Sequence, residues 1–244
     1  MKRLIITSFL LAAICAGASA QVLLTGAGQA VLGSDGGGGG QSVWNPSDKN
    51  AAVSLSTTTV TNDTATTNTG SWVSVRGTKS YSTGTADKVV FAQTGSGVNS
   101  GEAWILGLAD STMSLSSYLG ATGVSLGFQS NTGGGCAGDC SYSNGGVTIQ
   151  SSGECQLISN SQAVYLAINF NNGHVFCSVG DCSSWANSGN PDSDTGYVAT
   201  LAGSTTYFAA WAGEDYSGSA PMSVLNTAPS LGGCTNVSTF SQWG

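Results

Sequence analysis

The sequence predicts an all-β protein, in which two antiparallel sheets pack as a β-sandwich stapled by disulfides. The strongest observation is residues 163–178, where apolar side chains recur at every second position from Val164 to Phe170. This is the period of a strand with one face in a core. Asn172 and Gly173 follow, and both tolerate the positive φ of a tight turn, before a second apolar run returns. We therefore interpret this stretch as a central hairpin.

The composition supports strands and turns over helices. Charged residues make up 8% of the 244 residues, against about 25% in an average chain. Glycine occurs 36 times, and serine and threonine are abundant. The formal net charge of −7 argues against a nucleic-acid partner, because nucleic acids select basic surfaces.

Residues 1–20 have the pattern of a secretory signal peptide. Lys2 and Arg3 precede an apolar run over residues 4–14, and an A-x-A cleavage site ends at Ala20. This run is well short of the ~20 apolar residues that a membrane span takes. We expect no membrane span and cleavage near Ala20, which would place the mature protein in the periplasm, on the cell surface or outside the cell.

The mature chain divides into a leader and one domain. Residues 21–42 are rich in glycine, with five in a row at residues 36–40, and predict a flexible leader with a short strand at 22–24. A phosphate-binding glycine loop would need a helix after it, and no helical pattern follows. Residues 43–244 predict a single all-β domain, because sandwiches often reach this length.

Short apolar runs separated by Gly, Ser and Asn turns predict the remaining strands. Before the central hairpin the expected strands are residues 53–60, 71–80, 88–93, 103–109, 124–129 and 147–150. After it they are residues 197–201, 206–213 and 222–226. Residues 62–70 have the composition of a polar turn, and residues 110–120 have a faintly helical pattern. Many short strands with frequent turns are typical of an antiparallel sandwich.

Five stretches occur in the chain in a fixed order: SWVSVRGTKSYSTG, AWILGLADSTMSLSSYLG, VSLGFQS, AINFNNGHVFCS and WANSGNPDSDTG. Together they resemble a SPRY (B30.2-like) domain of the type found in bacterial and phage-associated proteins. The resemblance covers roughly residues 44–244. It implies a concanavalin A-like lectin/glucanase fold and a non-catalytic binding module. Such a module would recognise a protein or glycan surface through loops at one edge of the sandwich.

The cysteines predict disulfides. Removal of Cys15 with the signal peptide leaves six: Cys136, Cys140, Cys155, Cys177, Cys182 and Cys234. An even number in an exported chain suggests up to three disulfides, with 15 alternative pairings. We favour Cys177 with Cys182, because a short turn could join them. A zinc site is the alternative, but the spacings lack a second knuckle and His174 is the only histidine.

Aromatic residues in polar surroundings are the candidate ligand contacts. Tyr118, Trp185 and Tyr216 are flanked by Ser, Asn, Asp and Gly. An exposed aromatic ring and the apolar face of a sugar bury each other well, while polar neighbours bind the hydroxyls. The alternative for each ring is packing beneath loops.

A calcium loop is a second hypothesis. Asn190, Asp192 and Asp194 place oxygen ligands at every second position, and Gly196 follows. We favour a polar turn held by Asx hydrogen bonds over an ion at this position. The sequence predicts no other cofactor.

Catalysis is a weaker hypothesis than binding. Glycoside hydrolysis takes two facing carboxyl groups, and the three glutamates, Glu102, Glu154 and Glu214, do not form an E-x-D-x-x-E pattern. A Ser-His-Asp triad could use only His174, which follows a turn glycine. We therefore expect an exported, non-enzymatic binding module. The alternatives are a surface protein that assembles through its leader and a sheet edge, and a glycan hydrolase.

Overall fold

The computed structural model describes residues 21–24, 30–33, 42–57, 63–96, 103–129, 141–150, 155, 161–215 and 221–244. The chain divides into two units, Met1–Gly40 and Gln41–Gly244. In the first unit, β1 (Gln21–Leu24) pairs with β2 (Ala30–Gly33) as an antiparallel hairpin. The short strand expected at residues 22–24 therefore lies within β1. The signal sequence and the run of five glycines lie outside the described residues.

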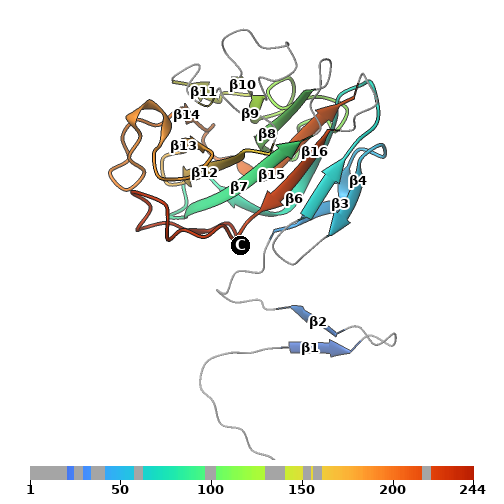
Figure 1. Ribbon diagram of the computed structural model, residues 1–244, viewed down its shortest axis with the longest axis horizontal. Helices are drawn as coiled ribbons and strands as arrows, with labels where there is room; N and C mark the ends of the chain where they lie inside the picture. The colour runs from blue at the N-terminus through green and yellow to red at the C-terminus, as the bar shows by residue number, and fades with distance from the viewer. Residues whose placement is uncertain are drawn as a thin grey trace, which may run out of the picture. The chain divides into compact units, whose positions relative to one another are not determined.

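The second unit consists of two sheets that pack face to face (Figure 1). In order across the six-stranded sheet, the strands are β10 (Ser141–Asn144), β9 (Ser125–Gln129), β8 (Ala103–Ala109), β15 (Thr206–Glu214), β6 (Val73–Ser82) and β3 (Trp44–Lys49). In the nine-stranded sheet they are β11 (Thr148–Ile149), β14 (Ala199–Thr200), β13 (His174–Val179), β12 (Ala163–Asn169), β7 (Lys88–Ser96), β16 (Met222–Asn226), β5 (Asp63–Thr66) and β4 (Ser54–Thr57), with β17 (Ser241–Gln242) beside β7.

All pairings are antiparallel apart from that of β17, which runs parallel to β7. The predicted antiparallel two-sheet β-sandwich is therefore confirmed. One short 3-10 helix, η1 (Ala186–Ser188), interrupts the strands. None of the described residues forms a helix with the length and apolar character that crossing a membrane takes.

The core lies between the two sheets. Alternate side chains of β7 and β12, including Phe91 and Leu166, meet Leu106 and Trp211 from the six-stranded sheet. The large rings are accommodated by small residues opposite them. A Cβ added to Gly95 would lie 2.3 Å from Cε2 of Trp104, so this indole packs directly against the glycine backbone.

The predicted central hairpin is confirmed in its strands and corrected in its turn. Strands β12 and β13 pair in register, with Asn169 opposite His174. The turn contains four residues, 170–173, closed by a hydrogen bond of 2.8 Å from Gly173 N to Asn169 O. Gly173 alone in this turn has a positive φ, of 77°. The turn is longer than the tight Asn172-Gly173 turn that was expected, because the Phe170 backbone pairs with another loop: its N–H donates to Asp87 O at 2.9 Å, and its carbonyl oxygen accepts from Gly84 N at 2.7 Å.

Two other local predictions were wrong. Residues 62–70, expected to be a polar turn, contain β5, because strand pairing to β4 and β16 overrides a weak local propensity. The faintly helical residues 110–120 form successive turns and no helix. Strands β8 and β16, by contrast, have the predicted bounds.

Among the described residues, two disulfides staple the second unit. Cys155 bonds to Cys177 and Cys182 bonds to Cys234, with Cα–Cα distances of 6.1 and 4.4 Å. The predicted Cys177–Cys182 pair was wrong, because each sulfur has a partner that the fold brings from a distant part of the chain. Cys136 and Cys140 lie outside the described residues. Disulfides indicate an oxidising environment.

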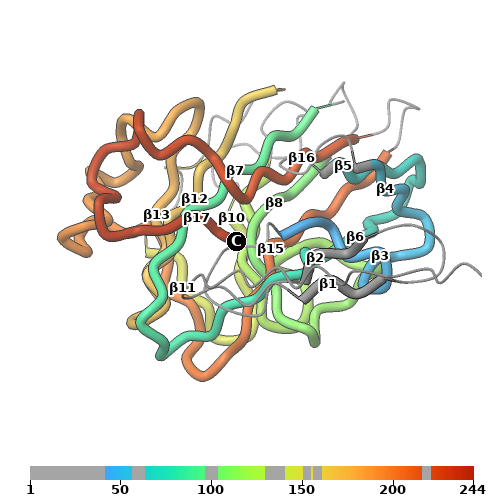
Figure 2. Tube along the Cα trace, turned by 90° about the horizontal axis from the view of Figure 1, so that it is seen from below, coloured from blue at the N-terminus to red at the C-terminus, as the bar shows by residue number. Residues whose placement is uncertain are grey.

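A C-terminal segment, residues 231–240, lies against the outer face of the nine-stranded sheet, beside the loop that follows β13 (Figure 2). Val237 and Phe240 pack there with Phe176 and Trp185. Asp192 fixes this segment, because its carboxylate accepts hydrogen bonds from the N–H and hydroxyl groups of Ser238 and Thr239. Burial raises the pKa of Asp192, but these donors outweigh it and hold the pKa below its ordinary value.

Candidate functional site

The candidate site lies on the outer face of the six-stranded sheet, at one end of β6 and β15. Along β15, Trp211 and Ala209 belong to the core between the sheets, whereas Ala210 and Ala212 belong to a separate cluster on the outer face. Because side chains alternate along a strand, Glu214 is on the same outer face as Ala210 and Ala212. The side chains on the outer face therefore do not belong to the core between the two sheets.

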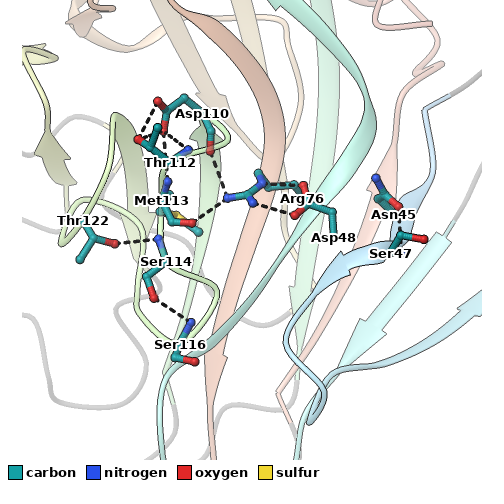
Figure 3. Close-up of polar contacts among 10 residues, drawn as sticks. All are labelled: Asn45, Ser47, Asp48, Arg76, Asp110, Thr112, Met113, Ser114, Ser116 and Thr122. Atoms are coloured by element: carbon teal, nitrogen blue, oxygen red, sulfur yellow. Dashed lines mark hydrogen bonds and ion pairs between the residues drawn. The ribbon is translucent and has the colours of Figure 1, made fainter.

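The loop of residues 110–124 covers part of this face and is folded by one carboxylate (Figure 3). Oδ1 of Asp110 accepts hydrogen bonds from the backbone N–H groups of Thr112, Met113 and Val124, at 3.1, 3.2 and 3.0 Å. The Thr112 hydroxyl donates to both carboxylate oxygens at 2.8 Å. An acceptor shared by several loop N–H groups explains why these residues form turns in place of a helix.

Arg76 ties the same loop to the sheet (Figure 3). Its side chain is 5% exposed and forms a bidentate ion pair with Asp48, with two N–O distances of 2.7 Å. Its Nη1 donates to the carbonyl oxygens of Asp110 and Met113, at 3.0 and 2.8 Å. The planar guanidinium therefore joins β3, β6 and the loop through four hydrogen bonds.

The far end of the loop is held by Ser74 and Asn50. Ser74 N donates to Leu115 O at 3.0 Å, and the Ser74 hydroxyl donates to Ser117 O. Nδ2 of Asn50 donates to the Ser116 hydroxyl at 3.0 Å. These contacts fix the backbone on both sides of Ser117 and place Tyr118 next to the start of β6.

Three half-buried rings form an aromatic cluster, which consists of Trp72, Tyr118 and Tyr142. The ring centroids of Trp72 and Tyr118 are 5.5 Å apart, and those of Tyr118 and Tyr142 are 5.6 Å apart. The interplanar angles of 55° and 69° are of the tilted and edge-to-face kinds that aromatic pairs prefer. Tyr142 comes this close because Gly120 lies beneath it: a Cβ on Gly120 would be 2.3 Å from Cβ of Tyr142.

Two pockets lie on either side of the Trp72–Tyr118 pair, which lines both of them. The larger pocket has a volume of about 680 Å³ and is lined also by Asn50, Ser116 and Glu214. The smaller pocket, of about 230 Å³, is completed by the residues Ile105, Gln129 and Tyr142. The site is therefore an aromatic ridge, formed by Trp72 and Tyr118, that two pockets share.

Glu214 is the titratable group of the larger pocket. Its side chain is buried, with the residue 2% exposed, and burial raises the pKa of its carboxyl group. Within the described part of the chain, no hydrogen bond to this carboxyl group is present. A carboxyl group that lines a pocket and has a raised pKa is typical of a binding or reactive site.

Replacing Glu214 with Gln is expected to raise stability slightly at neutral pH. A raised folded pKa means that the wild-type protein loses stability as pH rises from the ordinary glutamate pKa through the raised value. Glu214→Gln removes this loss, so the variant should be more stable at pH 7 by less than about 1 kcal/mol. Urea unfolding of the variant and the wild-type protein at pH 7 and at pH 3 measures the difference in their free energies of unfolding. No difference is expected at pH 3. A variant clearly less stable at pH 7 would show instead that the ionised carboxylate stabilises the fold.

The predicted ligand contacts Tyr118 and Trp185 lie in different parts of the structure, and their role in binding stays a prediction. Tyr118 lies in the aromatic cluster. Trp185 is 5% exposed, and its Nε1 donates to Thr235 O at 2.8 Å, so in this structure the ring packs beneath the C-terminal segment. Tyr216 lies outside the described residues. The sequence analysis did not single out Trp72 or Tyr142 and considered Glu214 only as a catalytic acid. Trp72 could have been found, because it alternates with the apolar residues that follow it and is thereby directed to the outer face.

The residues of the calcium hypothesis use their oxygens on protein donors. Asn190 Oδ1 accepts from Ser193 N at 3.1 Å, and Asp192 holds the C-terminal segment. Asp194 accepts from the side chains of Asn169 and Asn172 and contacts His174 Nδ1 at 3.0 Å. These contacts form a hydrogen-bonded turn, and the calcium hypothesis stays a prediction. No group of three or more His, Cys, Asp or Glu that could hold a metal is found among the described residues.

No protein-family profile matches the sequence, and no curated protein matches it significantly. The SPRY domain of human HERC1 is similar in structure, with a TM-score of 0.48 and 7% sequence identity over 77% of this chain and 99% of that chain. The carbohydrate recognition domain of Emp46p, in its potassium-bound form, has a TM-score of 0.46 and 12% identity over 74% of this chain and 88% of that chain. At scores this low, neither likeness carries an argument about function.

The class of protein is instead defined by the chain itself. It is a disulfide-stapled β-sandwich of two antiparallel sheets. A pocket with aromatic walls opens on one outer face, where loops from several strands meet at the end of the sheet.

Proposed function

We propose that this domain is an exported, non-catalytic module that binds a neutral carbohydrate in the larger pocket. The observation that carries the proposal is that half-exposed Trp72 and Tyr118 share this pocket with the buried carboxyl group of Glu214. A sugar ring has an apolar face that an aromatic ring can cover, and hydroxyls at its edge that donate to a carboxylate. Both complements are present within one cavity.

The lining supports an uncharged ligand. Among the described residues that line the larger pocket there is no Lys or Arg, and the polar groups are hydroxyls, an amide and the carboxyl group of Glu214. Phosphate, sulfate and uronate groups are bound by Arg and Lys. Anionic glycans therefore lack a counter-charge at this site, and the formal net charge of −7 also disfavours them.

The size of the cavity supports a small ligand over a protein surface. Pockets for small molecules usually measure about 300–1,000 Å³, and the larger pocket falls inside that range. Stable protein interfaces are broad and bury about 1,200–2,000 Å² in total. A concave site with a few convergent polar groups is the form that a sugar requires.

The lining also supports binding without hydrolysis. Glycosidases use two carboxyl groups on opposite sides of the bond that breaks. Of the described residues that line the larger pocket, Glu214 is the one acidic residue. We therefore assign Glu214 the role of accepting hydrogen bonds from ligand hydroxyls. The disulfides agree with export, since they form in oxidising compartments.

Binding is tested on an array of neutral and anionic oligosaccharides, followed by calorimetric titration of the ligands found. Neutral glycans are expected to bind, and Trp72→Ala is expected to weaken them about thirtyfold, because a central aromatic contact contributes about 2 kcal/mol. Trp72→Phe keeps a ring in place and should lose much less affinity.

His174→Ala is the matched control for this experiment, because it changes a half-buried ring on the other sheet, stacked on Tyr197 at 3.6 Å. It should leave glycan affinity unchanged. An array without any neutral glycan ligand would contradict the proposed function, as would equal affinity of the Trp72→Ala and parent proteins.

A further inference from the structure

The smaller pocket has a chemical character different from that of the larger one. Three of its walls are the rings of Trp72, Tyr118 and Tyr142, and Ile105, 1% exposed, forms its base. The one amide in its lining belongs to Gln129, which is 6% exposed. This pocket therefore combines aromatic walls with one side-chain amide.

The orientation of the Gln129 amide is fixed by Tyr142. The Tyr142 hydroxyl donates to Gln129 Oε1 at 2.6 Å, so the amide oxygen is used. Among the described residues, no acceptor bonds to the amide nitrogen, and this nitrogen therefore offers N–H donors to the pocket. Because Gln129 lines the pocket, a ligand carbonyl placed there could accept a hydrogen bond from this nitrogen.

The volume limits what the smaller pocket can hold. At about 230 Å³ it falls below the usual range of about 300–1,000 Å³ for a ligand pocket. It shares the Trp72–Tyr118 ridge with the larger pocket, so a sugar held against that ridge is next to it. The smaller pocket thus fits one substituent of the sugar and not a second ligand.

We propose that the smaller pocket is a subsite for the acetamido group of an N-acetylated amino sugar. The acetamido methyl packs against the aromatic rings and Ile105, and its carbonyl oxygen accepts a hydrogen bond from Gln129 Nε2. A hydroxyl at the same position of the sugar would leave the apolar walls uncovered. This inference rests on the proposed carbohydrate site and specifies the class of sugar that it takes.

The test is calorimetric titration of the parent protein with three oligosaccharides of the same length and linkage, built from N-acetylglucosamine, glucosamine or glucose. The N-acetylglucosamine oligomer is expected to bind at least about tenfold more tightly than the glucose oligomer, as one methyl group in a hydrophobic pocket achieves. Gln129→Met is expected to reduce its affinity about tenfold, because it removes the donor and keeps a side chain of similar volume.

Gln242→Met is the matched control, because it makes the same exchange at an exposed glutamine that lines neither pocket. It should retain the preference for the acetylated sugar. Equal binding of the glucose oligomer, or tighter binding of glucosamine, would overturn the acetamido subsite and leave the proposed carbohydrate site standing. Failure of every oligosaccharide tested here and of every glycan on the array would overturn both. The comparison of the three oligosaccharides needs only the parent protein. It therefore tests the acetamido subsite even if the Gln129→Met protein does not fold.

Discussion

Trp243→Ala is expected to destabilise the second unit by about 3–5 kcal/mol, the usual cost of removing a fully buried tryptophan. The Trp243 ring is completely buried. Its centroid lies 4.8 Å from those of Tyr81 and Phe91, and 5.9 Å from that of Phe170. Its backbone N–H donates to Val90 O at 2.9 Å, which extends the pairing of β17 with β7. Urea unfolding followed by circular dichroism measures the loss.

Two further variants separate the packing of this ring from other effects. Trp243→Phe should cost about 1–2 kcal/mol, because the indole N–H has no acceptor among the described residues and only packing is lost. Gln242→Ala changes the exposed neighbour and should be close to neutral. If Trp243→Ala unfolded at the same urea concentration as the parent, the seating of Trp243 in the core would be disproved.

Arg76→Met should be the second most damaging substitution, with a loss of about 3 kcal/mol. Removing one partner of a buried ion pair typically costs about 3–5 kcal/mol, and the lower figure applies because the Asp48 side chain is 25% exposed. The substitution also leaves the carbonyl groups of Asp110 and Met113 without their donor. Because these carbonyls begin the loop that carries Tyr118, glycan affinity should fall together with stability.

Arg76→Lys tests whether the geometry of the guanidinium matters, since a lysine keeps the charge but cannot bond Asp48 twice and reach two carbonyls. It should recover less than half of the stability lost in Arg76→Met. Lys79→Met removes a cation from the same strand, with no ion pair present at Lys79 among the described residues, and should change stability little. Equal stability of the Arg76→Met and Lys79→Met proteins would rule out a structural role for the buried pair.

The strands were predictable because their signal is local. In β16 the alternation of buried and partly buried side chains is visible within a few residues. In β12 the same alternation begins the strand and an apolar run ends it. The same reasoning failed at β5, whose threonines and alanine have no such pattern. There the neighbouring strands β4 and β16 supply the pairing, which local sequence does not contain.

The disulfides and the position of Trp185 were not predictable for a related reason. The partner of Cys182 is 52 residues away, and the same C-terminal segment covers Trp185. A polar local sequence therefore surrounds a side chain that is buried by residues far along the chain. Only the three-dimensional arrangement shows which aromatic residues remain available.

Part of the candidate site was visible in the sequence. Tyr118 was identified from its polar neighbours, but its partners are Trp72, just before β6, and Tyr142 in β10. Reasoning from a single sequence finds no link across such sequence distances. Glu214 was considered only as a catalytic acid. The burial of Glu214 raises the pKa of its carboxyl group and places that group in the wall of the larger pocket. This burial depends on the loops at the end of the sheet.

The hydrogen bonds of the Asp110 carboxylate have a consequence for the thermodynamics of recognition. A loop ordered by its own polar contacts has little conformational entropy left to lose when a ligand arrives. Such preorganisation spares the complex the ordering cost that mobile recognition loops incur. Affinity at this face should therefore depend on the match between ligand and rings, since the scaffold that presents Tyr118 has already been ordered by folding.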